Sequence, residues 1–233
     1  MKLIRRNGLL LVVVGSMALL PTLNASTIYN NSVNDLSVRF NPGTTEVGDE
    51  ILLGGTDRYL TTFSFEYYGT NTASPGNITF SGAVQARVKF YQNDGPLFNT
   101  YATPGTVIFD SDWFGGFGPT ARSTLVFTAG SDFPLAGLYL PVSSNMTWSV
   151  QFRNLGATDE VGVDLYSPPT VGGNYPDYWD HSSGWELKTN AVAVDFASKM
   201  DATVPEPSPV VLSTLGGVGL LLLSRFVRRK RRS

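Results

Sequence analysis

The chain has 233 residues, with 17 basic and 19 acidic side chains, one histidine and no cysteine. The lack of cysteine excludes a disulfide framework and a thiol nucleophile, and a single histidine excludes a two-histidine metal site. Nine basic residues lie in the first six and last nine positions, whereas all acidic residues lie between Asp35 and Glu206. Eight basic against 19 acidic residues give the part between them a net charge near −11, which argues against binding of nucleic acid or anionic polymer by bulk charge.

Residues 1–25 have the organisation of a secretory signal peptide. Lys2, Arg5 and Arg6 precede an apolar run over residues 9–20, and a short exit segment ends at Ala25. About 12 apolar residues are too few for an ordinary membrane span, so an uncleaved anchor is the weaker alternative. We expect export and cleavage after Ala25.

Residues 26–203 are predicted to form an all-β ectodomain. Apolar and polar residues alternate with period two along several segments, which is typical of antiparallel strands with one buried face. Turn sequences rich in proline, glycine and asparagine separate these segments. The predicted strands cover residues 27–30, 36–40, 51–53, 62–67, 78–81, 84–91, 107–110, 124–128, 138–140, 146–153, 161–166 and 192–197. We expect an antiparallel β-sandwich, specifically a jelly roll, because long loops interrupt a simple hairpin order.

Two acidic residues at a predicted strand end, Asp110 and Asp112, allow three interpretations. Two residues apart on a strand, their side chains point to the same side. They cap a loop, or bind calcium together with the flexible glycine loop that follows, or act as the carboxylate pair of a glycoside hydrolase. His181 lacks a glycine-flanked nucleophile elbow and is interpreted as a loop histidine with aromatic neighbours. No catalytic residue is assigned.

Aromatic residues are concentrated in loops that also carry aspartate. Sugar rings stack their C–H faces on aromatic rings, while carboxylates and amides bind the hydroxyl groups. The alternative is that these rings plug the ends of the sandwich as part of its core. The residues proposed for glycan contact are Trp113, Tyr175, Tyr178, Trp179, Asp180 and Trp185.

The last thirty residues form a tail of three parts. Residues 204–209 are a stiff proline-rich segment, and residues 209–227, as a helix, would reach roughly 28 Å, close to the thickness of the bilayer's hydrocarbon core. Basic residues at 225–233 are expected to stay in the cytoplasm as a stop-transfer signal. They are Arg225, Arg228, Arg229, Lys230, Arg231 and Arg232.

The order of this tail resembles the bacterial PEP-CTERM sorting signal. The residues that carry the resemblance are Val204, Pro205, Glu206 and Pro207, followed by a glycine-containing apolar segment and the arginine-rich end. The resemblance implies recognition by the membrane protease exosortase, cleavage near the motif, and delivery to the cell surface or extracellular matrix. The alternative is an ordinary single-span anchor with a proline stalk.

These observations together predict a non-enzymatic exported protein. It would pass through the inner membrane, held there by its C-terminal helix, and then serve as a structural or adhesive surface component with polysaccharide as its candidate ligand. No cofactor is expected apart from the calcium considered above. The alternative is a secreted glycan-active hydrolase delivered by the same tail.

Overall fold

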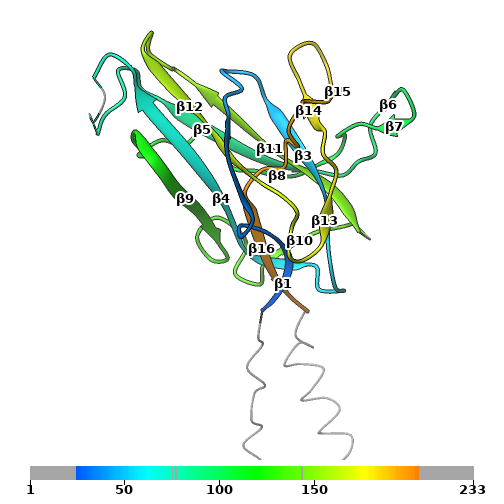
Figure 1. The fold of residues 1–233 in the computed structure, drawn as a ribbon. Helices are drawn as coiled ribbons and strands as arrows, with labels where there is room; N and C mark the ends of the chain where they lie inside the picture. The colour runs from blue at the N-terminus through cyan, green and yellow to red at the C-terminus, as the bar shows by residue number, and fades with distance from the viewer. Residues whose placement is uncertain (1–24, 75, 77, 143, 205–233) are drawn as a thin grey trace, which may run out of the picture.

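The computed structural model describes residues 25–204 apart from residues 75, 77 and 143 (Figure 1). Over this range the protein is all-β, with sixteen strands and no helix, and every strand pairing is antiparallel. Accordingly, no helix that could cross a membrane is found among the described residues. The segments predicted as signal peptide and as sorting tail lie outside them, except Ala25 and Val204.

One sheet, sheet A, is built around a single long strand. β4 pairs along one edge with β16 and then β12, and along its other edge with β10 and β9. β1 extends the sheet beyond β16, and β2 extends it beyond β12. The strands are β1 (Ser26–Asn31), β2 (Asp35–Phe40), β4 (Tyr59–Asn71), β9 (Thr120–Thr128), β10 (Leu138–Tyr139), β12 (Asp159–Tyr166) and β16 (Ser198–Thr203).

The second sheet, sheet B, has the order β15-β14-β3-β11-β5-β8, and β13 also pairs with β3. Its strands are β3 (Val47–Leu52), β5 (Gln85–Tyr91), β8 (Val107–Asp110), β11 (Asn145–Arg153), β13 (Gly173–Asn174), β14 (Tyr178–Asp180) and β15 (Glu186–Lys188). A separate small hairpin consists of β6 (Leu97–Phe98) and β7 (Tyr101–Ala102).

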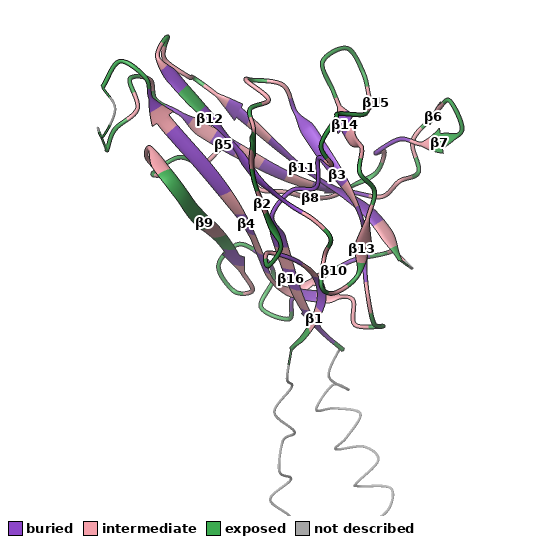
Figure 2. Cartoon of the chain, viewed as in Figure 1, coloured by how far each residue is buried: buried purple, intermediate pink, exposed green. Residues whose placement is uncertain are grey.

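The two sheets enclose an aromatic core. Phe63 of sheet A packs edge-on against Phe90 and Trp148 of sheet B, with ring centroids 4.9 and 5.1 Å apart. Buried and partly exposed residues alternate along β5 (Figure 2), because successive side chains of a strand point to opposite faces. The inward residues of β11 are Met146, Trp148, Val150 and Phe152, and all four are fully buried. The predicted alternation of residues 84–91 and 146–153 is confirmed.

Two predicted strands are wrong. Residues 78–81 form a loop, and residues 192–197 contain only an isolated bridge, while the strand lies just beyond, at β16. β16 was missed because it contains only two apolar residues, Met200 and Ala202, which are too few for a clear alternation. The short strands β6, β7, β13, β14 and β15 were also missed, since two or three residues carry no periodic signal.

Both ends of the described chain lie at one pole of the molecule. Ser26 pairs with Ala202 at the start of β1 and the end of β16. Figure 1 shows the chain entering and leaving there. β4 runs from this pole, where Tyr59 pairs with Thr203, to the opposite pole, where Asn71 pairs with Asp159. We call these the proximal and distal poles.

Candidate functional site

The outer face of sheet B carries most of the polar side chains predicted for the solvent side of strand 84–91. On β5, Arg87, Lys89 and Tyr91 alternate with the fully buried Ala86, Val88 and Phe90. Lys89 lies opposite Ser149 of the central strand β11. The side chains on this face therefore form rows held at the fixed spacing of paired strands.

Three of the four tryptophans lie on this outer face, while Trp148 is in the core. Trp113 stacks on the guanidinium groups of Arg153 and Arg87, at 4.1 and 5.8 Å from the ring centroid. Trp185 packs edge-on against Tyr91, with centroids 5.5 Å apart. Three rings from separate segments of the chain are thus brought to one side of one sheet.

Trp179, the third ring, covers a glycine of the sheet. It pairs with Gly48, where an added Cβ would lie 2.6 Å from Thr147 and 3.6 Å from the Cβ of Trp179. Its indole Nε1 donates to Glu50 at 3.3 Å, and Phe98 of the small hairpin lies edge-on at 6.5 Å. Trp179 is 0% exposed, so its ring serves packing rather than contact with a ligand.

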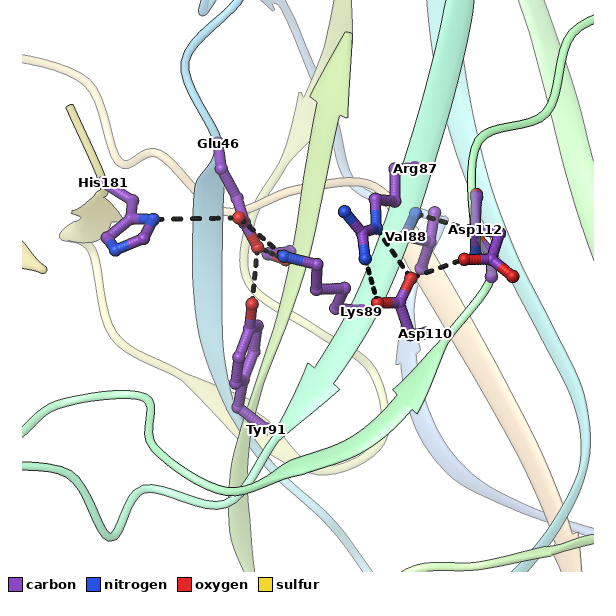
Figure 3. Close-up of polar contacts among 10 residues, drawn as sticks. Glu46, Arg87, Val88, Lys89, Tyr91, Asp110, Asp112 and His181 are labelled. Carbon is purple, nitrogen blue, oxygen red and sulfur yellow. Dashed lines mark hydrogen bonds and ion pairs between the residues drawn. The ribbon is translucent and has the colours of Figure 1, made fainter. Parts of the chain in front are cut away.

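Glu46 is the polar centre of this face (Figure 3). Its carboxylate accepts hydrogen bonds from Ser149 Oγ at 2.7 Å, Tyr91 Oη at 2.8 Å and Lys89 Nζ at 3.0 Å, and His181 Nδ1 lies 3.8 Å away. Burial raises the pKa of Glu46, but the bonds from Ser149, Tyr91 and Lys89 outweigh it and leave the pKa below its ordinary value. Glu46 is therefore held as a carboxylate.

The loop that carries Trp185 is fixed to this centre. The backbone N–H of His181 donates to the Glu46 carbonyl at 3.0 Å. The imidazole ring stacks on Trp185 with centroids 4.3 Å apart and an interplanar angle of 21°. Because Trp185 also packs on Tyr91, the loop lies against the sheet, and His181 is a loop histidine with aromatic neighbours as expected.

Asp110 is part of an ion pair. The Arg87 guanidinium donates to both carboxylate oxygens, with Nε at 2.7 Å from Oδ1, and the Asp112 backbone N–H donates to Oδ1 at 3.0 Å. The Arg87 guanidinium holds the pKa of Asp110 below its usual range, against the opposing effect of burial. Asp112 adopts a positive φ of 53° in the turn.

This arrangement does not support calcium at Asp110 and Asp112, because Arg87 already occupies the oxygens of Asp110. Within the described ranges, no group of three or more histidine, aspartate or glutamate side chains is arranged to hold a metal ion. The loop-capping interpretation fits the hydrogen bond from the Asp112 backbone to Asp110.

The six residues predicted for glycan contact do not form one surface. Tyr178 points inward and packs on Phe40 at 4.8 Å, because it is adjacent to the outward Trp179 on the same strand. Asp180 accepts a hydrogen bond from the Ser182 backbone at 3.0 Å and so closes a turn. Tyr175 is 43% exposed in the loop before β14. Trp113, Trp179 and Trp185 share the outer face of sheet B.

The sequence reasoning missed the residues between these rings. Local alternation places Arg87, Lys89 and Tyr91 on the solvent side of their strand, but nothing in the local sequence connects them with Glu46 or His181. Arg153 was likewise only an outward residue of its strand. Local alternation reveals the face of a strand, not which distant loop lies over it.

No protein-family model matches this chain, and comparisons with characterised proteins and with solved structures found no significant similarity. The chemistry of the site therefore rests on its geometry. The outer face of sheet B combines half-buried aromatic rings with carboxylate, ammonium and guanidinium groups in fixed orientations, which suits a ligand with both C–H faces and hydroxyl groups.

Proposed function

We propose that this protein is an exported, non-enzymatic surface or matrix component that binds polysaccharide through the outer face of sheet B. The observation that carries the proposal is the gathering of Trp113 and Trp185, both half-buried, on the same face as the Glu46 and Asp110 networks. An indole ring can stack on many different sugars, whereas oriented hydrogen-bonding groups select sugars by the positions of their hydroxyl groups.

The polar groups of this face are ordered before any ligand arrives. Glu46 is held by three donors, and Arg87 and Asp110 hold each other. A side chain already fixed in one conformation loses less entropy when a ligand binds. This order supports a binding role, because Arg87 and Asp110 are partly exposed and a sugar can bind them without reorganising them.

The position of the chain ends supports display from a membrane or matrix. β1 begins and β16 ends at the proximal pole, so a removed signal peptide and a C-terminal tether would both leave the same end. The outer face of sheet B and the distal pole would then be free of the tether. We propose processing by an exosortase near residues 204–207, on the resemblance of the tail.

The strand order supports assigning the sandwich to the jelly-roll type. The order β2-β12-β4-β9 in sheet A faces β3-β11-β5-β8 in sheet B. The chain alternates between sheets so that eight strands form two interleaved Greek keys, the connectivity of a jelly roll. The other strands of the described chain are then additions to this framework: β1, β6, β7, β10, β13, β14, β15 and β16.

The alternative, a glycan-active hydrolase using Asp110 and Asp112, has less support. Glycoside hydrolysis requires one carboxylic acid protonated near neutral pH, so its pKa must be raised. The pKa of Asp110 is shifted in the opposite direction by Arg87. We therefore propose binding without catalysis.

A glycan array tests the proposal directly. The purified chain in detergent should bind at least one polysaccharide, and Trp185→Ala should weaken that binding by about 1 kcal/mol with little change in melting temperature. Tyr139→Ala is the matched control, because Tyr139 is an exposed aromatic residue of sheet A. Equal losses from both substitutions, or no binding to any glycan, would reject the proposal.

A further inference from the structure

An open pocket of about 610 Å³ lies at the distal pole, beyond the end of the outer face of sheet B. It is lined by residues 78–80, 82–85 and 115–118, and by Asn154. Asp159 anchors two of the neighbouring loops, because its carboxylate accepts hydrogen bonds from the backbone N–H groups of Ser81, Gly82 and Gly156 at 2.7, 2.7 and 2.8 Å. The pocket is therefore bordered by loops tied to the sandwich and lies at the pole opposite both chain ends.

The walls of this pocket consist of aromatic side chains and of backbone. Phe80 and Phe117 meet edge-on with centroids 6.2 Å apart, and the pocket reaches the buried Val84. Gly118 allows the chain to approach closely, since an added Cβ would lie 2.5 Å from the Ile78 carbonyl oxygen. Such walls suit the C–H faces of a ring.

Next to the pocket, bonded to one of its lining residues, is an arginine without an acidic partner. Gln85, which lines the pocket, accepts a hydrogen bond from Arg153 Nε at 2.9 Å and from Asn154 Nδ2 at 3.3 Å. The guanidinium group is also stacked on Trp113. No carboxylate of the described residues lies within ion-pair distance of Arg153, in contrast to Arg87 one strand away.

The Arg153 guanidinium is thus oriented but not neutralised. Gln85 fixes its Nε and Trp113 covers one face of its plane, and no hydrogen bond from its terminal amino groups is found in the described part of the chain. A planar guanidinium binds a carboxylate through two parallel hydrogen bonds, which makes arginine selective for this group. Asp159 nearby does not offer such a partner, because its oxygens are taken by backbone N–H groups.

We propose that the distal pocket binds a uronic acid residue of an acidic polysaccharide, with Arg153 receiving its carboxylate and the aromatic walls its ring. This inference rests on the proposed function and specifies its ligand. The acidic ectodomain repels polyanions at long range. Recognition of an acidic glycan therefore requires a local, oriented cation, and Arg153 supplies it.

Calorimetric titration of the full chain in detergent tests this assignment with two matched probes, polygalacturonate fragments and the same fragments methyl-esterified. The wild type should bind the acid form about tenfold or more tightly than the ester, as expected for a charge-assisted pair. Arg153→Gln should abolish this preference, and Arg153→Lys should retain part of it. Lys199→Gln, which removes one cation from sheet A, should leave the preference unchanged.

The outcomes separate the inference from the function on which it rests. Equal binding of acid and ester, or a preference that survives in a folded Arg153→Gln variant, overturns the inference. If a neutral glycan still binds and Trp185→Ala weakens that binding, the proposed function stands even though the uronic acid inference fails. If dextran sulfate binds as tightly as polygalacturonate, the pocket is a general anion site, and the assignment of a uronic acid as its ligand is overturned. Failure of all these probes and of the glycan array would reject both.

Discussion

Glu46 and Asp49 lie three residues apart but in opposite environments. Glu46 lies on the outer face of sheet B, where three side chains donate to its carboxylate. Asp49 points between the sheets and is 0% exposed. It accepts one hydrogen bond, from the Phe196 backbone at 2.9 Å, and within the described residues its Oδ1 has no partner.

The pKa values of the two acids move in opposite directions. Burial raises the pKa in both cases, but in Glu46 the donors outweigh it. For Asp49, burial and the charge of Asp195 raise the pKa well above its ordinary value. The hydrogen bond from the Phe196 backbone lowers the pKa but does not offset these two effects. Donors, rather than depth, decide whether a buried carboxylate is tolerated as an anion.

A second acid shares the interior with Asp49. Asp195 is also buried, and burial raises its pKa to about 6 despite the polar side chains of Ser167 and Asn174. Tyr29 is also fully buried, and burial together with the charges of Asp49 and Asp195 raises the pKa of its hydroxyl. Glu50 and Asp177 add further negative charge around the pair.

The largest expected effect concerns Trp179, which lies on the outer face but is buried like a core residue. Trp179→Ala should lower the free energy of unfolding by about 4 kcal/mol, because deletion of a large buried ring leaves a cavity. Urea denaturation measures this, with Trp185→Ala as the matched, half-buried control. A loss of less than about 1 kcal/mol for Trp179→Ala would show that the outer face is not packed as described.

Glu46→Ala should lower the free energy of unfolding by about 3 kcal/mol at pH 7, since removal of one partner leaves Lys89 and the Tyr91 hydroxyl in a buried site without their acceptor. Chemical denaturation provides the measurement, and Glu160→Ala, at an exposed position of β12, is the control. Equal effects of the two substitutions would contradict the role assigned to the donors.

Asp195→Asn should have the opposite effect and raise the free energy of unfolding by about 2 kcal/mol above pH 6. A folded pKa of about 6 against an ordinary 3.8 means that the folded wild type binds more protons between these values. The stability of the wild type therefore falls as the pH rises from 4 to 6, and the amide removes this fall.

Melting temperatures of wild type and Asp195→Asn across pH 4 to 8 test this expectation. The two curves should meet near pH 4 and separate up to pH 6, while Glu160→Gln should follow the wild type throughout. Parallel curves would show that Asp195 is not the group responsible.

The smallest expected effect is that of Asp110→Asn, about 1 kcal/mol or less, because the Arg87 pair is partly exposed to solvent. The effect of Asp110 on stability changes with pH in the opposite direction to that of Asp195. A lowered folded pKa contributes stability at neutral pH that is lost as the pH falls below the ordinary value of 3.8. Thermal melts at pH 7 and pH 3 should therefore show a smaller difference between mutant and wild type at pH 3.

Strand alternation allowed much of the framework to be predicted. Residues 84–91 and 146–153 were assigned with the correct inner and outer faces, because large apolar side chains alternate with polar ones along them. β16 was not predicted, because residues 198–203 alternate only weakly. The role of Glu46 was not predicted, because this residue precedes its strand and is not part of an alternating pattern. The pairing of Arg87 with Asp110 requires knowing that β8 lies beside β5, which no local pattern reveals.

By itself the sequence determined that residues 26–203 are all-β, and which side chains of the two clearest strands point inward, because burial of apolar groups imposes a period of two on a strand. Only the tertiary structure decided that Trp179 is buried while Trp185 stacks on His181, and that Glu46 has three side-chain donors while Asp49 has one backbone donor. These differences depend on contacts between segments far apart in the chain. The free energy of a polar or aromatic side chain is set by those neighbours and not by its own position in the sequence.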